Sequence, residues 1–277
     1  MYPHRTLGAN LMAEFLLEAK NVSVTFGSGS TKVEAVKNCS LTLRAGEPIG
    51  IVGESGSGKS TLARVLAGLQ APTEGEIFFN GEPVYKGSKS YTGEARRQVQ
   101  MVFQDPYGSL NPQLTGLNAV AEAVRIHDKT NKEESENRAL ELLRRMGIAE
   151  LDAIKKPRQL SGGQRQRVSV ARALSANPTV LLADEPTSAI DQSAQAQLLN
   201  LFRGLLDDGL AIVLVSHDLG VIRYLTQRVY VMKDGVFVES GVTEEIFNDP
   251  REEYTKLLLA SIPGELGVAA RKKLNKI

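Results

Sequence analysis

The chain has 277 residues, 42% of them hydrophobic, and its 33 Lys and Arg residues nearly balance 32 Asp and Glu residues, for a formal net charge of +1. This composition is that of an ordinary globular protein with one large domain or a core carrying an inserted subdomain, and it argues against nucleic-acid binding through a broad basic face. The single cysteine, Cys39, excludes an internal disulfide, a four-cysteine zinc site and a cysteine-ligated cluster, so we interpret it as a structural thiol. The longest apolar stretches, such as residues 210–215, fall far short of the roughly 20 residues that a membrane-spanning helix needs.

Residues 1–11 carry no periodicity, and they lack the apolar core and cleavage site of a secretory signal. Strand-like sequence begins directly after Met12. We therefore expect residues 1–13 to be a disordered or additional N-terminal extension, or Met12 to be the true start.

Strand-like and helix-like segments then alternate, which favours an α/β fold. Glycine-rich turns and loops separate the segments, and Asn80-Gly81 is a strong hairpin signal. In chain order we predict strands at 16–26, 36–43 and 48–52, a helix at 59–69 and a strand pair at 76–84.

The middle of the chain is rich in Ala, Glu, Arg and Leu, and we predict helices over 116–146, with Leu140, Leu142 and Leu143 facing inward and Gly147 as a C-cap. From Pro178 the α/β pattern returns. We predict strands at 179–183, 211–216, 228–233 and 236–240, the last two around Asp234-Gly235, and helices at 192–206 and 219–226. The predicted domains are therefore a core at 14–250, a helical subdomain inserted at about 104–177, and a C-terminal helix with a basic, solvated tail at 251–277.

Residues 53–60 match the phosphate-binding pattern G-x-x-x-x-G-K-[ST] and lie between a predicted strand and a predicted helix. Glycines let consecutive backbone N–H groups converge on phosphate oxygens at a helix N-terminus, where the helix dipole also favours negative charge. Lys59 adds a positive charge at the β and γ phosphates, and the Ser60 hydroxyl ligates Mg²⁺. The predicted nucleotide-binding residues here are Gly53, Glu54, Ser55, Gly56, Ser57, Gly58, Lys59, Ser60 and Thr61.

An apolar segment, Val180 to Ala183, ends in the two carboxylates Asp184 and Glu185. Beside a phosphate-binding loop, Asp184 is suited to orient Mg²⁺ and Glu185 to accept a proton from an attacking water. We therefore predict a metal ligand at Asp184 and a general base at Glu185.

Leu160-Ser161-Gly162-Gly163-Gln164 precedes a helix with Val168, Ala171 and Leu174 on its inward side. Such a polar, glycine-rich N-terminus presents free N–H groups to an anion, although it could also be a plain helix cap.

In this segment the sequence resembles the ATP-binding cassette (ABC) family, whose signature is Leu-Ser-Gly-Gly-Gln, and the resemblance extends over roughly residues 16–263. It implies a P-loop NTPase core of ABC type, with a mixed or parallel sheet, an N-terminal antiparallel β portion and an inserted helical subdomain. It also implies that the signature, residues 161–164, closes on the γ-phosphate held by an opposite subunit.

Four further positions match the family pattern. Gln104 resembles the glutamine that touches Mg²⁺ or water, and His217 resembles the histidine that contacts the γ-phosphate. Asp191 ends a loop usually written Ser-Ala-Leu-Asp, which carries Ile190 in this chain. Phe26 resembles the aromatic residue that stacks on adenine, although a core Phe is the alternative.

Residues 104–112 and 248–258 look like the branch of the family that imports oligopeptides, dipeptides and nickel or metal chelates, although a generic capped helix is the alternative for 248–258. The resemblance implies an ATP-hydrolysing subunit that uses ATP and Mg²⁺ and sits peripherally on the cytoplasmic side of the inner membrane. Its implied partners are two membrane-spanning permease subunits, a second ABC ATPase, identical or paralogous, in an ATP-sandwich dimer, and indirectly an extracytoplasmic solute-binding protein, with no nucleic acid. Many members of this branch add a cysteine cluster, which Cys39 alone cannot form.

The alternative function is a soluble ABC-type ATPase that acts as an adaptor in a metabolic or nucleic-acid complex without membrane subunits. The chain has no zinc cysteines, no long coiled-coil arm and no second cassette, which disfavours the repair and translation versions of this alternative.

Overall fold

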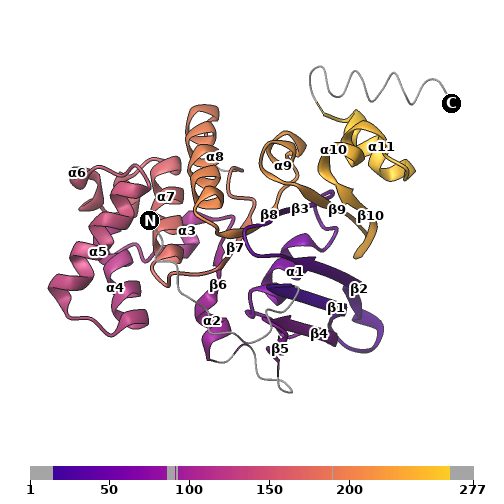
Figure 1. Ribbon diagram of the computed structural model, residues 1–277, viewed down its shortest axis with the longest axis horizontal. Helices are drawn as coiled ribbons and strands as arrows, with labels where there is room; N and C mark the ends of the chain where they lie inside the picture. Colours follow the sequence, from indigo (N-terminus) through magenta and orange to yellow (C-terminus); the bar gives the residue numbers. More distant parts are fainter. Residues whose placement is uncertain (1–14, 86–90, 92, 189, 263–277) are drawn as a thin grey trace. The chain divides into compact units, whose positions relative to one another are not determined.

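The computed structural model describes residues 15–85, 91, 93–188 and 190–262, so the predictions for residues 1–13, Met12 and the basic tail lie outside the described residues (Figure 1). The chain divides into two compact units, one formed by residues 1–92 and 211–277 and the other by residues 93–210. The predicted helical insertion falls inside the second unit. The division into extension, core and tail stays a prediction.

The first unit contains an antiparallel sheet built around the first strand. In this sheet β1 pairs with both β2 and β4, and Leu17 lies opposite Leu43 on one side and Phe79 on the other. These three side chains are buried, so one face of the sheet covers a core. The sheet has the order β2-β1-β4-β5, and its strands are β1 (Leu17–Phe26), β2 (Val33–Leu43), β4 (Glu74–Phe79) and β5 (Glu82–Pro83), with a short 3-10 turn, η1 (Gly29–Thr31), between β1 and β2.

A second set of strands in the first unit has β3 in its interior, parallel to both β8 and β9, while β10 is antiparallel to β9. Every residue of β3 and of β8 is buried, as expected for parallel strands covered on both faces. The elements are β3 (Pro48–Val52), β8 (Ala211–Val215), β9 (Arg228–Lys233), β10 (Val236–Val242), α1 (Lys59–Leu66), α9 (Leu219–Leu225), α10 (Thr243–Asn248) and α11 (Glu253–Ala260).

The hairpin turn predicted at Asn80-Gly81 is present, and a second one lies at Asp234-Gly235, between two predicted strands. Asn80 and Gly81 have φ values of 50° and 77°, and Asp234 and Gly235 have φ values of 49° and 86°, the positive pair that a type I′ turn requires. Cys39 is buried, and its thiol donates to the carbonyl oxygen of Gly235 at 3.3 Å, which confirms a structural thiol.

Helix α1 ends at Leu66, three residues before the predicted end at Leu69. Gly68 terminates it, because its φ of +70° leaves the helical region and a Cβ at this position would lie 2.1 Å from the ring of Tyr91. The Tyr91 hydroxyl also donates to the carbonyl oxygen of Leu66.

In the second unit, β6 and β7 form a parallel pair and α4 packs against both α5 and α7. The inward face of α5 differs from the prediction: Ala139 and Leu143 are buried, whereas Leu140 and Leu142 are only partly buried. The elements are β6 (Val99–Val102), β7 (Val180–Asp184), α2 (Glu94–Gln98), α3 (Pro106–Ser109), α4 (Gly116–Asp128), α5 (Lys132–Arg145), α6 (Glu150–Ala153), η2 (Pro157–Gln159), α7 (Gly162–Leu174) and α8 (Gln192–Asp207).

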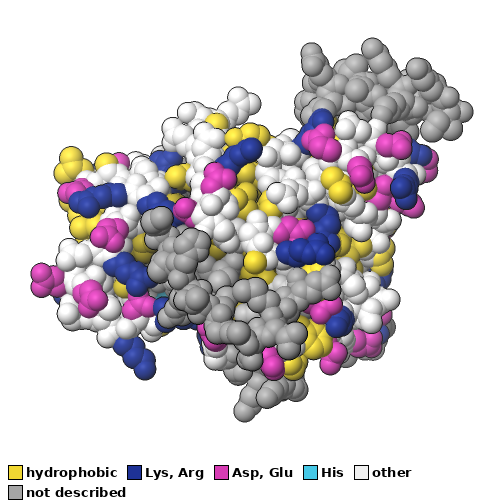
Figure 2. Space-filling model, in the orientation of Figure 1, with side chains coloured by type: hydrophobic (Ala, Val, Ile, Leu, Met, Phe, Trp, Pro, Cys, Tyr) yellow, Lys and Arg dark blue, Asp and Glu magenta, His cyan; other side chains and the backbone are white. Residues whose placement is uncertain are grey.

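Among the described residues, every helix is too short or too polar to cross a membrane. On the face that Figure 2 shows, the described Lys and Arg side chains are interspersed with Asp and Glu.

Candidate functional site

The phosphate-binding loop of the first unit is folded around the ammonium group of Lys59. This side chain is buried, and its Nζ donates to the carbonyl oxygens of Gly53 at 2.8 Å and Glu54 at 2.7 Å. The loop starts where β3 ends and closes at Gly58, the left-handed N-cap of α1. Lys59 therefore holds the first turn of α1 and the start of the loop together. Ser55 is exposed at the loop tip, and Ser60 and Thr61 are half-buried in the first turn of α1.

Close backbone packing beneath the loop explains its glycines. A Cβ on Gly53 would lie 2.1 Å from the carbonyl oxygen of Met232, and one on Gly58 would lie 2.2 Å from that of Ala35. Both glycines also have positive φ values, 155° and 104°. By contrast, no described atom lies within 4 Å of a Cβ built on Gly56. The loop is thus packed against backbone on its inner side and open at Gly56, as a cradle for a phosphate group must be.

One contact to this loop was not predicted from the sequence, although Tyr254 lies within residues 248–258. The hydroxyl oxygen of Tyr254, in α11, accepts the backbone N–H of Glu54 at 3.0 Å. Burial raises the pKa of the Tyr254 hydroxyl above its ordinary value, so it stays protonated at neutral pH.

The two other predicted site residues of the first unit are exposed. Phe26 is the last residue of β1 and is 46% exposed, so it is not a core side chain. His217 follows β8 and immediately precedes Asp218, whose carboxylate caps α9 by accepting the N–H of Gly220 at 2.9 Å. Their roles stay predictions.

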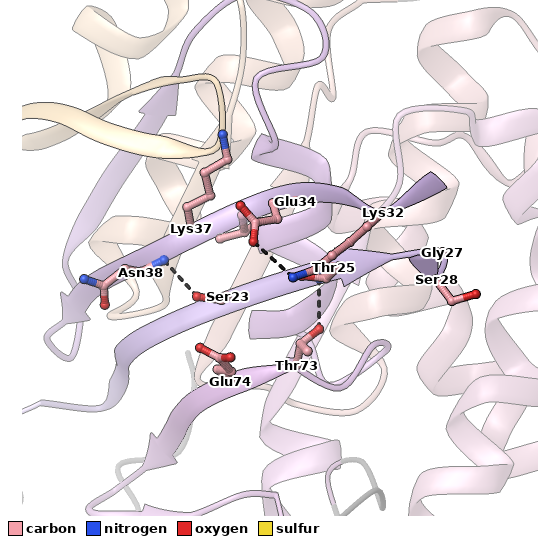
Figure 3. Close-up of a pocket in the computed structure, with 11 residues that line it drawn as sticks. Ser23, Thr25, Gly27, Ser28, Lys32, Glu34, Lys37, Asn38, Thr73 and Glu74 are labelled. Carbon is pink, nitrogen blue, oxygen red and sulfur yellow. Dashed lines mark hydrogen bonds and ion pairs between the residues drawn. The ribbon is translucent and has the colours of Figure 1, made fainter. Parts of the chain in front are cut away.

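A polar groove of about 470 Å³ lies over the antiparallel sheet of the first unit (Figure 3). Ser23 and Thr25 of β1 line it. The Ser23 hydroxyl accepts the N–H of Asn38 at 3.0 Å, and the N–H of Thr25 donates to the Thr73 hydroxyl at 2.9 Å. The described lining includes Gly27 and Ser28 next to Phe26, but no residue of the phosphate-binding loop.

The predicted acids of the second unit lie at the end of β7. Asp184 is buried as its last residue. The next residue, Glu185, is half-buried and has a φ of +43°, an uncommon conformation for a residue other than glycine. The Nε2 of Gln104, just beyond β6, donates to Oε2 of Glu185 at 3.0 Å. The structure therefore brings together two of the residues predicted to be catalytic.

The signature segment is held by a reciprocal capping arrangement. The Ser161 hydroxyl accepts the N–H of Gln164 at 3.1 Å, and the Gln164 side-chain oxygen accepts the N–H of Ser161 at 2.9 Å. The side-chain nitrogen of Gln164 also donates to Asp152 at 2.8 Å. Gln164 thus positions the segment, while Ser161 is exposed at the N-terminus of α7 and Gly162 is its first residue.

The start of α7 packs against the start of α8. A Cβ on Gly163 would lie 2.6 Å from the Cβ of Ala194, so glycine is required for this approach. Asp191 caps α8 by accepting the N–H of the same Ala194 at 2.8 Å. The structure therefore brings the signature close to the start of α8, which Asp191 caps.

Replacing Ser161 tests whether it is only a helix cap. We expect Ser161→Ala to lower the free energy of unfolding by about 1 kcal/mol, because the cap is lost, and Ser161→Asn to retain most of it. If the hydroxyl also acts on nucleotide, both variants lose most ATP turnover, measured as phosphate release. Full turnover in Ser161→Asn would leave the serine with a capping role alone.

Comparisons with known proteins identify the family to which the chain belongs. Residues 36–188 match the family model described as ABC transporter. The chain is 39% identical to the oligopeptide transport ATP-binding protein AmiF of Streptococcus pneumoniae, over 96% of this chain and 87% of the relative. It is 43% identical to the oligopeptide transport ATP-binding protein OppF of Bacillus subtilis, over 91% of this chain and 84% of the relative.

Among solved structures, a dimeric, post-hydrolysis form of the ATP-binding cassette MJ0796, bound to ADP and phosphate, is 36% identical, with a TM-score of 0.74 over 82% of this chain and 98% of that chain. The predicted fold class is confirmed by this likeness. The chain therefore belongs to the ABC transporter family, as an ATPase of that family.

Proposed function

We propose that the chain is the ATP-hydrolysing subunit that powers an oligopeptide importer. The observation that carries the proposal is the phosphate-binding loop closed around Lys59, in a chain that resembles two oligopeptide transport ATP-binding proteins over nearly its full length. The proposed location is peripheral, on the cytoplasmic side of the inner membrane, beneath two membrane-spanning permease subunits that receive cargo from a solute-binding protein.

The first unit supplies nucleotide binding. In this proposal the N–H groups of residues 56–61 surround the phosphates, Lys59 neutralises part of their charge, and the exposed ring of Phe26 stacks on adenine. His217 would contact the γ-phosphate. The open cradle at Gly56 supports the fit of a phosphate at this loop.

The three residues predicted to ligate Mg²⁺ carry oxygen atoms that suit this cation, which prefers hard oxygen ligands. Ser60, Asp184 and Gln104 offer a hydroxyl, a carboxylate and an amide oxygen, and the bound cation would supply charge neutralisation on the phosphates. Glu185 would accept the proton of the attacking water, and the bond from Gln104 holds its carboxylate in place.

Turnover in this proposal requires a second cassette, identical or paralogous, because residues 161–164 would act on the nucleotide of the partner. The solved relative with ADP and phosphate is a dimer, which supports this arrangement. Contacts that exist only with the γ-phosphate present would close the dimer, and hydrolysis would reopen it.

The names of the relatives favour peptides as cargo over the nickel and metal chelates that the sequence left open. The cassette would not touch cargo, so cargo is tested by uptake. Cells depleted of this chain are expected to lose uptake of labelled oligopeptides while nickel uptake is unchanged; the reverse result would contradict the peptide assignment.

The proposal as a whole is tested by purifying a Glu185→Gln variant from gently solubilised membranes with ATP and Mg²⁺ and identifying its partners by mass spectrometry. We expect two polytopic membrane proteins, with or without a second cassette. Recovery of soluble partners alone, with the chain absent from membranes, would favour the soluble adaptor instead.

A further inference from the structure

The C-terminal helix α11 contacts the phosphate-binding loop at its first peptide group. The Tyr254 hydroxyl accepts the N–H of Glu54, which belongs to the same planar peptide as the carbonyl of Gly53. That carbonyl oxygen, on the opposite side of the peptide, accepts from Nζ of Lys59 at 2.8 Å. A phenol and an ammonium group therefore hold one peptide plane from its two ends.

Tyr254 is itself held in place by the rest of the first unit. The carboxylate of Glu239, on β10, accepts the N–H groups of Arg251 at 2.8 Å and Glu252 at 3.2 Å, and so anchors the segment that leads into α11. The ammonium of Lys233 lies 4.9 Å from the centre of the Tyr254 ring, within cation–π distance. The hydroxyl is thus presented by a tethered helix.

The hairpin between β9 and β10 supports the same loop. The N–H of Gly235 donates to the carbonyl oxygen of Ser57 at 3.0 Å. Because Lys233 and Glu239 lie on the two strands of this hairpin, the hairpin contacts both the loop and α11. The loop, the hairpin and α11 therefore contact one another in pairs, and the Lys59 ammonium bonds to the loop.

We propose that Tyr254 is a positioning residue for nucleotide binding: its hydroxyl orients the Gly53–Glu54 peptide, and through that peptide it places the Lys59 ammonium beneath the phosphates. The C-terminal helix is then part of the nucleotide site. This inference rests on the proposed binding of ATP at the loop.

The expected effect is modest, because a neutral hydrogen bond to a hydroxyl contributes on the order of a two- to tenfold change in an equilibrium constant. Tyr254→Phe removes only the hydroxyl and keeps the ring under Lys233. We expect the dissociation constant for ATP and the KM to rise two- to tenfold together, with kcat at saturating ATP changed less than twofold, because Lys59 placement affects bound substrate and transition state alike.

Tyr230→Phe is the matched control, since the Tyr230 hydroxyl also accepts a backbone N–H, that of Thr42 at 3.3 Å, on a strand of the same unit. ATP affinity is measured by calorimetry on the purified chain, and exchange of the Glu54 amide by hydrogen–deuterium exchange. We expect faster exchange at Glu54 and weaker ATP binding in Tyr254→Phe alone. Glu239→Gln, which weakens the tether of α11 without touching Tyr254, is expected to shift both quantities in the same direction.

Unchanged ATP affinity and amide exchange in a folded Tyr254→Phe would overturn the inference, and so would an equal loss in Tyr230→Phe. If Tyr254→Phe does not fold, unchanged affinity in Glu239→Gln overturns it instead. These outcomes differ from failure of the proposed function, in which the unaltered chain neither binds nor hydrolyses ATP.

Discussion

Glu185→Gln is expected to abolish ATP turnover and to preserve ATP binding. The substitution keeps the shape of the side chain, and an amide oxygen can still accept the bond that Gln104 donates to Glu185 at 3.0 Å. An amide cannot accept a proton from water, so phosphate release should fall by roughly 10²- to 10⁴-fold, the contribution typical of a general base. With hydrolysis blocked, ATP should hold two cassettes together, as a dimer on size-exclusion chromatography.

Glu141→Gln is the control for Glu185→Gln, because Glu141 is an exposed carboxylate on α5 of the same unit. It should change phosphate release less than twofold. Undiminished hydrolysis in Glu185→Gln would mean that Glu185 is not the general base. Loss of ATP binding in this variant would mean that the negative charge of Glu185 is needed to bind ATP before the reaction.

Gly58→Ala is expected to destabilise the protein strongly and to eliminate ATP binding. The φ of +104° at Gly58 is costly for alanine, and the added Cβ would lie 2.2 Å from the carbonyl oxygen of Ala35, a backbone atom that cannot rotate away. The backbone strain and the overpacking each cost about 1–3 kcal/mol. We therefore expect the free energy of unfolding, measured with urea, to fall by roughly 4 kcal/mol. The loop must also shift, which displaces Lys59.

Gly209→Ala isolates the backbone cost in Gly58→Ala. Gly209 has a φ of +89°, and no described atom lies within 4 Å of a Cβ built there. The free energy of unfolding of this variant should fall by about 1 kcal/mol, and its affinity for ATP should be unchanged. If Gly58→Ala and Gly209→Ala lower the free energy of unfolding equally, the close approach to Ala35 does not contribute to the destabilisation.

The elements that the sequence predicts well are those with a local physical cause. Asn80-Gly81 and Asp234-Gly235 each provide two adjacent residues that tolerate positive φ, so both turns were predictable. The end of α1 was not, because Leu69 continues the helical spacing and only the approach of the Tyr91 ring to Gly68 shows where the helix stops. The buried face of α5 was also not predictable from its leucines. Ala139 and Leu143, four residues apart, lie on one face of the helix and are buried, whereas the neighbouring Leu140 and Leu142 are only partly buried.

The same distinction applies to the candidate site. The phosphate-binding loop and the capped signature helix follow from contiguous residues, and both have the predicted local form. The approach of Gly163 to Ala194 and the bond between Tyr254 and Glu54 join distant segments, the latter 200 residues apart. Tertiary packing decides these contacts, and a single sequence carries no pattern that marks them.

The backbone of Glu185 has a consequence for how this protein can change over generations. Its φ of +43° makes it the only non-glycine among the predicted site residues, as far as the structure describes them, in the left-handed region, which costs on the order of 1–3 kcal/mol. Glycine or asparagine would relieve that cost at once. Selection for stability alone would therefore replace Glu185, the proposed base. Homologues of this chain that are no longer selected for ATP hydrolysis should then become inactive but more stable.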